Sequence, residues 1–135
     1  MRKTAVCIVA LGLAACAELF GPVWATRLGS IDQTLGHVTV PDTVATNTNF
    51  LVSFTTSGGG CDRMGNTQVT MVDSRTAEIR GYDDYQVNPS ACVSILYLFH
   101  HTSTVQFAHA GISTVRLIGA YNDSTITVTR TVVVQ

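Results

Sequence analysis

The residues best suited to hold a metal ion are histidines and cysteines beyond residue 60. The sequence offers His100, His101 and His109, with Cys61 and Cys92 before them, and zinc and copper bind such nitrogen and sulfur ligands. Adjacent histidines in a strand point to opposite faces, so His100 and His101 are poorly placed to share one ion. No short paired-ligand spacing occurs. A metal site built on these histidines, with or without the cysteines, is therefore an alternative rather than the preferred interpretation.

Cys61 and Cys92 are better explained as a disulfide than as metal ligands. Cys7 and Cys16 lie in the first sixteen residues, which leaves Cys61 and Cys92 as an even pair. In an oxidising compartment two such cysteines most often pair. Closing the loop between them would stabilise a small domain by about 3–4 kcal/mol on the chain-entropy model.

A polar stretch in the middle of the chain is the preferred contact surface for a partner. It begins with Tyr82, Asp83, Asp84 and Tyr85. It lacks the carboxylate spacing and the glycine of calcium-binding loops, so we expect an exposed loop. Tyrosine supplies contact area at low entropic cost. Residues 82–90 and 57–65 are thus predicted as surfaces for a protein or glycan partner.

No motif of a catalytic or cofactor-binding site stands out. The run Gly58-Gly59-Gly60 is followed by Cys61-Asp62-Arg63, without the lysine and helix of a phosphate-binding loop. A nucleophile elbow of the form G-x-S-x-G does not occur. We therefore predict a non-catalytic protein without a cofactor.

The elements that must position these residues are strands. The chain is rich in threonine and valine, which favour strands over helices. Short alternating segments are separated by turn signals such as Tyr121-Asn122-Asp123-Ser124, and no helical period is sustained after residue 16. The predicted strands are His37–Val40, Phe50–Phe54, Gln68–Val72, Thr76–Tyr82, Val93–His100, Thr104–Phe107, Ser113–Ala120 and Thr125–Val134. Seven or eight such strands predict an all-β sandwich.

The N-terminus has the pattern of an export signal. Arg2 and Lys3 precede an apolar run over residues 5–15. A membrane-spanning helix needs about 20 apolar residues, so this run fits a signal peptide instead. One alternative is ordinary secretion, with cleavage after the small-x-Ala pattern Val23-Trp24-Ala25.

The end of this run, Leu13-Ala14-Ala15-Cys16, resembles the lipobox of bacterial lipoprotein precursors. The resemblance implies a signal peptide over residues 1–15 and a diacylglycerol on the thiol of Cys16, which becomes the first residue. Two or more acyl chains anchor a protein stably, at about 0.8 kcal/mol per buried CH₂. Ala17, where retained inner-membrane lipoproteins tend to carry aspartate, favours the outer membrane if the organism has one.

The composition of the chain after the expected signal peptide limits the kinds of partner that it can bind. From Cys16 onward there are six arginines, no lysine and nine acidic residues, a net charge of −3. Such a chain has no basic surface for nucleic acid. We expect a lipidated tether over residues 16–30, broken by Gly21-Pro22, and one domain over residues 31–135.

The domain resembles bacterial immunoglobulin-like domains in two places. Residues 105–111 followed by 113–117 are similar to their penultimate strands, and residues 38–44 are similar to their opening strand and turn. The resemblance implies an Ig-like Greek-key β-sandwich of 7–8 strands, although the domain lacks the tryptophan and tyrosine corner of antibody domains, because Trp24 lies before it. A small barrel is the alternative fold. The function expected is a lipid-anchored envelope protein with a non-catalytic binding or structural module. The alternative is a small metal-binding envelope protein.

Overall fold

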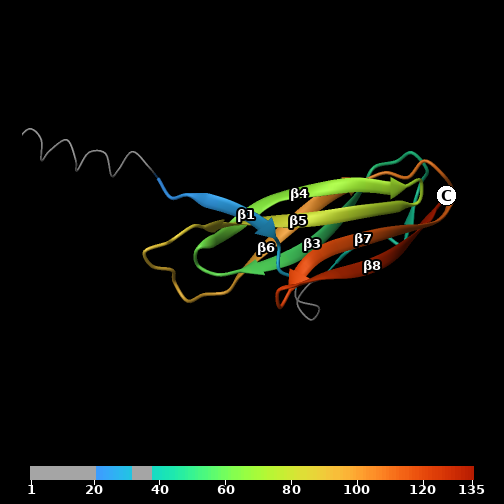
Figure 1. Cartoon of the computed structure of the whole chain (residues 1–135). Helices are drawn as coiled ribbons and strands as arrows, with labels where there is room; N and C mark the ends of the chain where they lie inside the picture. The colour runs from blue at the N-terminus through green and yellow to red at the C-terminus, as the bar shows by residue number, and fades with distance from the viewer. Residues whose placement is uncertain (1–20, 32–37) are drawn as a thin grey trace, which may run out of the picture.

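The computed structural model describes residues 21–31 and 38–135, and every regular element in these ranges is a β-strand (Figure 1). Residues 1–20, with the expected signal peptide and Cys16, and residues 32–37 lie outside the described ranges. None of the described segments is a helix long and apolar enough to cross a membrane. The strands are β1 (Trp24–Leu28), β2 (Thr43–Val44), β3 (Phe50–Gly58), β4 (Asp62–Asp73), β5 (Thr76–Gln86), β6 (Tyr97–Val105), β7 (Gly111–Tyr121) and β8 (Ser124–Val134).

The larger sheet is built around β5. Strand β4 pairs antiparallel with one edge of β5 along most of its length. The other edge of β5 is shared, because β1 pairs antiparallel with Tyr82–Gln86 and β7 pairs parallel with Thr76–Arg80. Beyond β7, the sheet continues with the antiparallel partner β8 and the short parallel strand β2. The sheet is therefore mixed, with two parallel pairs.

The second sheet consists of β3 and β6, paired antiparallel from Phe50↔Val105 to Gly58↔Tyr97. Thr39 extends it by one bridge to Ser53. Ser30 joins the two sheets, since it bridges Ala120 of β7 and Ser57 of β3. In Figure 1, β3 and β6 lie behind the plane of β5, β7 and β8. The coarse prediction of an all-β sandwich is confirmed.

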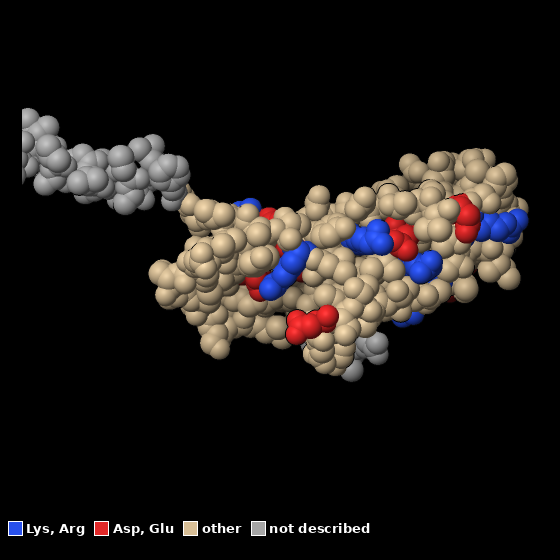
Figure 2. Space-filling view, viewed as in Figure 1, with Lys and Arg blue, Asp and Glu red and all other residues tan. Residues whose placement is uncertain are grey.

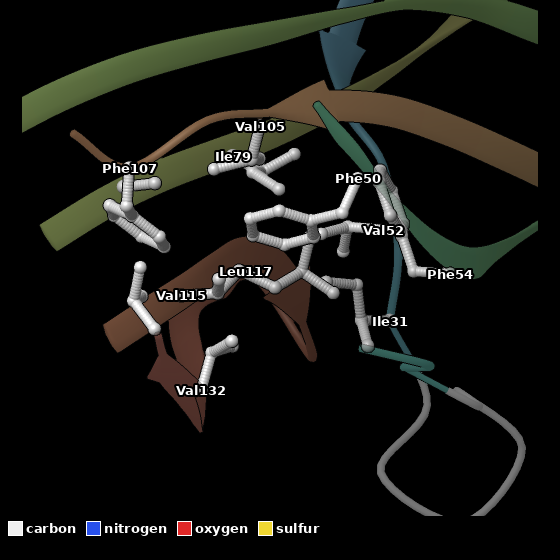
Figure 3. Packing of buried hydrophobic residues seen from close by; sticks show 12 residues of the cluster. Ile31, Phe50, Val52, Phe54, Ile79, Val105, Phe107, Val115, Leu117 and Val132 are labelled. Atoms are coloured by element: carbon white, nitrogen blue, oxygen red, sulfur yellow. The ribbon is translucent and has the colours of Figure 1, made fainter. Parts of the chain in front are cut away.

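The core lies between these layers and follows the alternation in the sequence. Every second side chain of β3, β5 and β7 points inward, because successive side chains of a strand point to opposite faces. Figure 3 shows Phe50 and Phe107 packed among aliphatic side chains, with ring centroids 5.8 Å apart. The buried cluster comprises Ile31, Phe50, Val52, Phe54, Ala77, Ile79, Val105, Phe107, Val115, Leu117, Val132 and Val134.

The turn predicted at residues 121–124 is confirmed by backbone conformation. Asn122 and Asp123 connect β7 to β8 with φ of 45° and 61°, and a two-residue hairpin with both φ values positive is the type favoured between antiparallel strands. Gly111 begins β7 with φ of 120°, a conformation that L side chains rarely adopt.

Several boundaries differ from the sequence predictions. Within the described part of the segment expected as a strand at 37–40, only Thr39 forms a bridge, and β4 begins at Asp62 instead of Gln68. The segments expected as strands at 93–100 and 104–107 contribute to one strand, β6, while residues 93–96 and 106–107 lie in the connections before and after it. A short apolar run has no period that distinguishes strand from connection. Strand β1 lies within the predicted tether 16–30, so the folded domain begins before residue 31.

Candidate functional site

The expected partner-binding loop is a strand. Tyr82, Asp83, Asp84 and Tyr85 all belong to β5 and pair with β1 on one side. Asp83 is 1% exposed, so its carboxylate is not available to a partner. The prediction of an exposed loop was wrong. Two adjacent aspartates are typical of a solvent-exposed segment, but the side chain of Asp83 points inward and has a buried partner on a strand distant in sequence.

That partner is His101, at the centre of a buried polar cluster. Its Nε2 lies 3.1 Å from Oδ1 of Asp83 and 2.9 Å from Oγ1 of Thr56. The imidazole stacks on Phe54, with ring centroids 5.0 Å apart and planes 7° from parallel. Three strands, β3, β5 and β6, therefore contribute to one polar contact between the sheets.

Two glycines, Gly29 and Gly81, pack directly against the residues of this cluster. A Cβ at Gly29 would meet Cγ2 of Thr56 at 2.6 Å and Oδ2 of Asp83 at 2.8 Å. A Cβ at Gly81 would meet Cε2 of Phe54 at 2.4 Å. Both glycines are needed for close approach, because a larger residue would displace buried atoms. Sequence reasoning missed the cluster, since neither glycine is adjacent to the residues it covers.

The contacts of the Thr56–His101–Asp83 cluster differ from those of a catalytic triad. A hydrolase triad uses both ring nitrogens of its histidine, one toward the nucleophile and the other toward the carboxylate. Here Thr56 and Asp83 both contact Nε2 of His101. All three residues are buried, so a substrate has no access to the threonine hydroxyl.

The other candidate ligands are not brought together. His100 is exposed, with its Nδ1 3.1 Å from Oγ1 of Thr55, and His109 is exposed in the connection between β6 and β7. Cys61 and Cys92 form the predicted disulfide, with Cα atoms 5.3 Å apart. Within the described ranges, no three His, Cys, Asp or Glu side chains gather into a group able to hold a metal ion.

The outward side chains of β1 and β4 form a charged surface next to this region. Arg63 contacts Oδ2 of Asp84 at 3.1 Å, and Thr26 donates a hydrogen bond to Oδ1 of the same carboxylate at 2.7 Å. The Thr26 hydroxyl, followed by Arg63, holds the pKa of Asp84 below its ordinary value. Arg63 also lies over the ring of Trp24, 4.1 Å from its centroid. These contacts fix β1 against the domain.

A groove lies at the same end of the domain. It has a volume of about 700 Å³. Its floor includes the turn Gly58–Gly60 and the pair Arg27–Asp62, whose Nη2 and Oδ2 are 2.9 Å apart. Its other wall is the apolar segment 93–96. Both predicted contact segments, 57–65 and 82–90, contribute residues to it.

Comparison with known proteins yields no relative. No protein-family model, curated protein or solved structure matches this chain.

Proposed function

We propose that this protein is a lipid-anchored component of a bacterial cell envelope, held by acyl chains on Cys16 and displaying a non-catalytic β-sandwich module. The lipobox-like Leu13-Ala14-Ala15-Cys16 supplies the anchor. The buried, structural character of the Thr56–His101–Asp83 cluster supports a binding or scaffolding role rather than catalysis.

The position of β1 carries the proposal. Cleavage after Ala25, the alternative for ordinary secretion, would remove Trp24 and Ala25 from a strand that pairs with Gln86 and Tyr85. It would also delete Val23, whose carbonyl oxygen accepts a hydrogen bond from Val87 at 2.8 Å. Cleavage before Cys16 keeps the whole strand. A processing site outside the folded domain is the one compatible with these contacts.

We further propose that the sandwich is of the Ig-like Greek-key type. The antiparallel pairing of β3 with β6 and the β7–β8 hairpin support this assignment. The parallel pairs β5–β7 and β2–β8 are departures, because Ig-type sheets are antiparallel. Its working surface on this proposal is the groove between the turn Gly58–Gly60 and segment 93–96.

The anchor is tested by expressing the whole chain in a bacterial host with an alkyne-bearing fatty acid, followed by mass spectrometry of the N-terminal peptide. We expect label on a peptide that begins at Cys16, and no label in Cys16→Ser. Cys7→Ser is the matched control, since Cys7 lies inside the removed segment, and it should label normally. An unlabelled wild-type chain beginning at Thr26 would contradict the proposal and establish ordinary secretion.

A further inference from the structure

The end of the domain that receives the tether also carries an exposed apolar surface. We call it the apolar tip and define it as Val93, Ile95, Leu96, Tyr97 and Leu98. Each of these side chains is at least 42% exposed, and Val93 reaches 64%. A contiguous exposed apolar patch marks a binding surface for protein or membrane more often than it occurs by chance on a monomer.

The apolar tip has no charge within it. Residues 87–99 include no Lys, Arg, Asp or Glu. In Figure 1 this connection is the loop that projects at the end of the molecule where β1 begins, and Figure 2 shows that projecting end without red or blue atoms on the visible face. The side chains of the apolar tip offer few hydrogen-bonding groups to a polar partner. Contact with lipid hydrocarbon does not require such groups.

The connection between β5 and β6, which carries the apolar tip, is held in place by the β3–β4 turn. Cys92 is joined to Cys61 at the end of the β3–β4 turn. A Cβ at Gly60 would meet the backbone oxygen of Val93 at 2.3 Å, so the two backbones are in direct contact. The backbone N–H of Ile95 donates to the carbonyl of Val93 at 3.0 Å. The apolar side chains are therefore presented outward by a cross-linked support and do not fold back onto the core.

The N-terminal segment reaches the domain at the start of this same loop. Val87, the first residue after β5, donates its hydrogen bond to the carbonyl of Val23. Val23 stands seven positions after Cys16, and an extended chain of that length spans at most about 25 Å. A lipid on Cys16 would hold the bilayer within that distance of Val23, which is hydrogen-bonded to the first residue of the connection that carries the apolar tip.

The side chains around the tip suit a membrane interface. Trp24 lies at the start of β1 with the guanidinium of Arg63 over its ring, and Arg27 lies over the ring of Tyr85 at 5.1 Å. Tryptophan, tyrosine and arginine are favoured at the headgroup level, where an apolar body and a polar end are both satisfied.

We propose that the apolar tip inserts into the outer part of the bilayer that holds the Cys16 lipid, as a second membrane contact that fixes the orientation of the domain. This inference rests on the proposed lipid anchor. The occupant is a lipid surface, because the segment that leads to Cys16 meets the domain at Val87, in the same connection that carries the tip. The domain would then lie against the membrane instead of moving freely on its tether.

The test uses the processed, lipidated protein in phosphatidylcholine vesicles, with an environment-sensitive fluorophore on Leu96→Cys. Ser74→Cys is the matched position, because it lies in the exposed turn at the far end of β5. We expect blue-shifted emission and strong quenching by lipid-borne nitroxides at position 96, and neither effect at position 74. Water-like emission at position 96 in the anchored protein would overturn the proposal.

A pair of charge substitutions tests the apolar character of the contact. In the Leu96→Cys background, Ile95→Asp should reduce nitroxide quenching to the level of position 74. Ile112→Asp is the control, since Ile112 is more exposed than Ile95 (68% against 50%) and lies at the opposite end of the domain, and it should leave quenching unchanged. Equal losses in the two variants would contradict insertion of the tip.

Three further outcomes are distinguished by the same samples. Quenching that requires phosphatidylglycerol would overturn apolar insertion and assign the contact to Arg27 and Arg63. A blue shift without quenching, accompanied by dimers in sedimentation, would overturn it in favour of self-association. If mass spectrometry shows no lipid on Cys16, the anchor fails on its own, and vesicles added to the free processed protein decide the insertion of the tip by the same quenching criterion.

Discussion

The carboxylate of Asp83 and the imidazole of His101 meet 3.1 Å apart in the interior, and they come from strands of different sheets. Asp83 is 1% and His101 is 3% exposed. A polar contact of this kind is costly to form and more costly to break, because each partner has lost its water. The two sheets are thus joined by a contact that tolerates loss of both partners better than loss of one.

Replacing His101 alone should be strongly destabilising. His101→Leu leaves Asp83 buried beside Thr56, and we expect the free energy of unfolding to fall by about 3–5 kcal/mol. The double variant Asp83→Leu, His101→Leu should lose less than His101→Leu by itself, since no buried carboxylate remains. Urea denaturation followed by circular dichroism measures these two variants and the single variant Asp83→Leu. Additive losses would show that the two residues do not interact.

The contact between Gly60 and Val93 predicts opposite effects for neighbouring glycines. Gly60→Ala places a methyl group against backbone atoms that cannot rotate away, and should cost about 1–3 kcal/mol. At Gly59 the nearest atom would be 3.6 Å from the new Cβ, and Gly59→Ala should be neutral or stabilising by up to about 1 kcal/mol. Thermal denaturation of the two variants checks the order, which a reversed ranking would refute.

Removing the disulfide should weaken the domain without dissolving the core. Cys61→Ser with Cys92→Ser frees the connection 87–96, and the chain-entropy model gives a loss of about 3–4 kcal/mol. Reduced wild-type protein should unfold at the same urea concentration as the double variant. A midpoint unchanged by reduction would contradict a stabilising role for the bond.

Thr26 should control the titration of Asp84. Because the Thr26 hydroxyl is the leading cause of the lowered pKa of Asp84, Thr26→Val should raise that pKa toward its ordinary value. A folded pKa below the unfolded one stabilises the protein above about pH 4, and this contribution is lost as pH falls through the folded value. Stability of the wild type should therefore decline more steeply in acid than that of Thr26→Val.

Carboxyl NMR titration provides the direct measurement and an internal control. The pKa of Asp73 is lowered by a hydrogen bond from the backbone of Arg75 and by the Thr76 hydroxyl, at the far end of β5. It should not change in Thr26→Val. Equal displacement of Asp73 and Asp84 would show a global change in structure rather than loss of the Thr26 hydrogen bond.

Local patterns predicted most of the strands. Val115 and Leu117 were expected on one face and are both buried, and the hairpin at Asn122-Asp123 has the expected backbone. These features depend on neighbours in sequence, namely alternation and turn chemistry. The pairing of Cys61 with Cys92 was likewise predictable from the count of cysteines.

The candidate site was predicted less well because its contacts are distant in sequence. Asp83 is buried by His101 and Gly29, and no spacing near residue 83 indicates either. Segment 93–96 was expected to be a strand because its residues are apolar, yet it is exposed. An apolar residue is ordinarily predicted to be buried in the core. The sequence alone does not show when such a residue packs against nothing inside its own domain.

If the proposed anchor on Cys16 holds the protein by its N-terminus, the antiparallel pairing of β1 with β5 has a mechanical consequence. A pull transmitted through Val23 would act along the axis of β1, from Trp24 to Leu28. The hydrogen bonds of an antiparallel ladder run perpendicular to the strands, so they would be loaded in shear and would share the force. A domain attached in this way resists drag at the cell surface with its whole first ladder rather than one bond at a time.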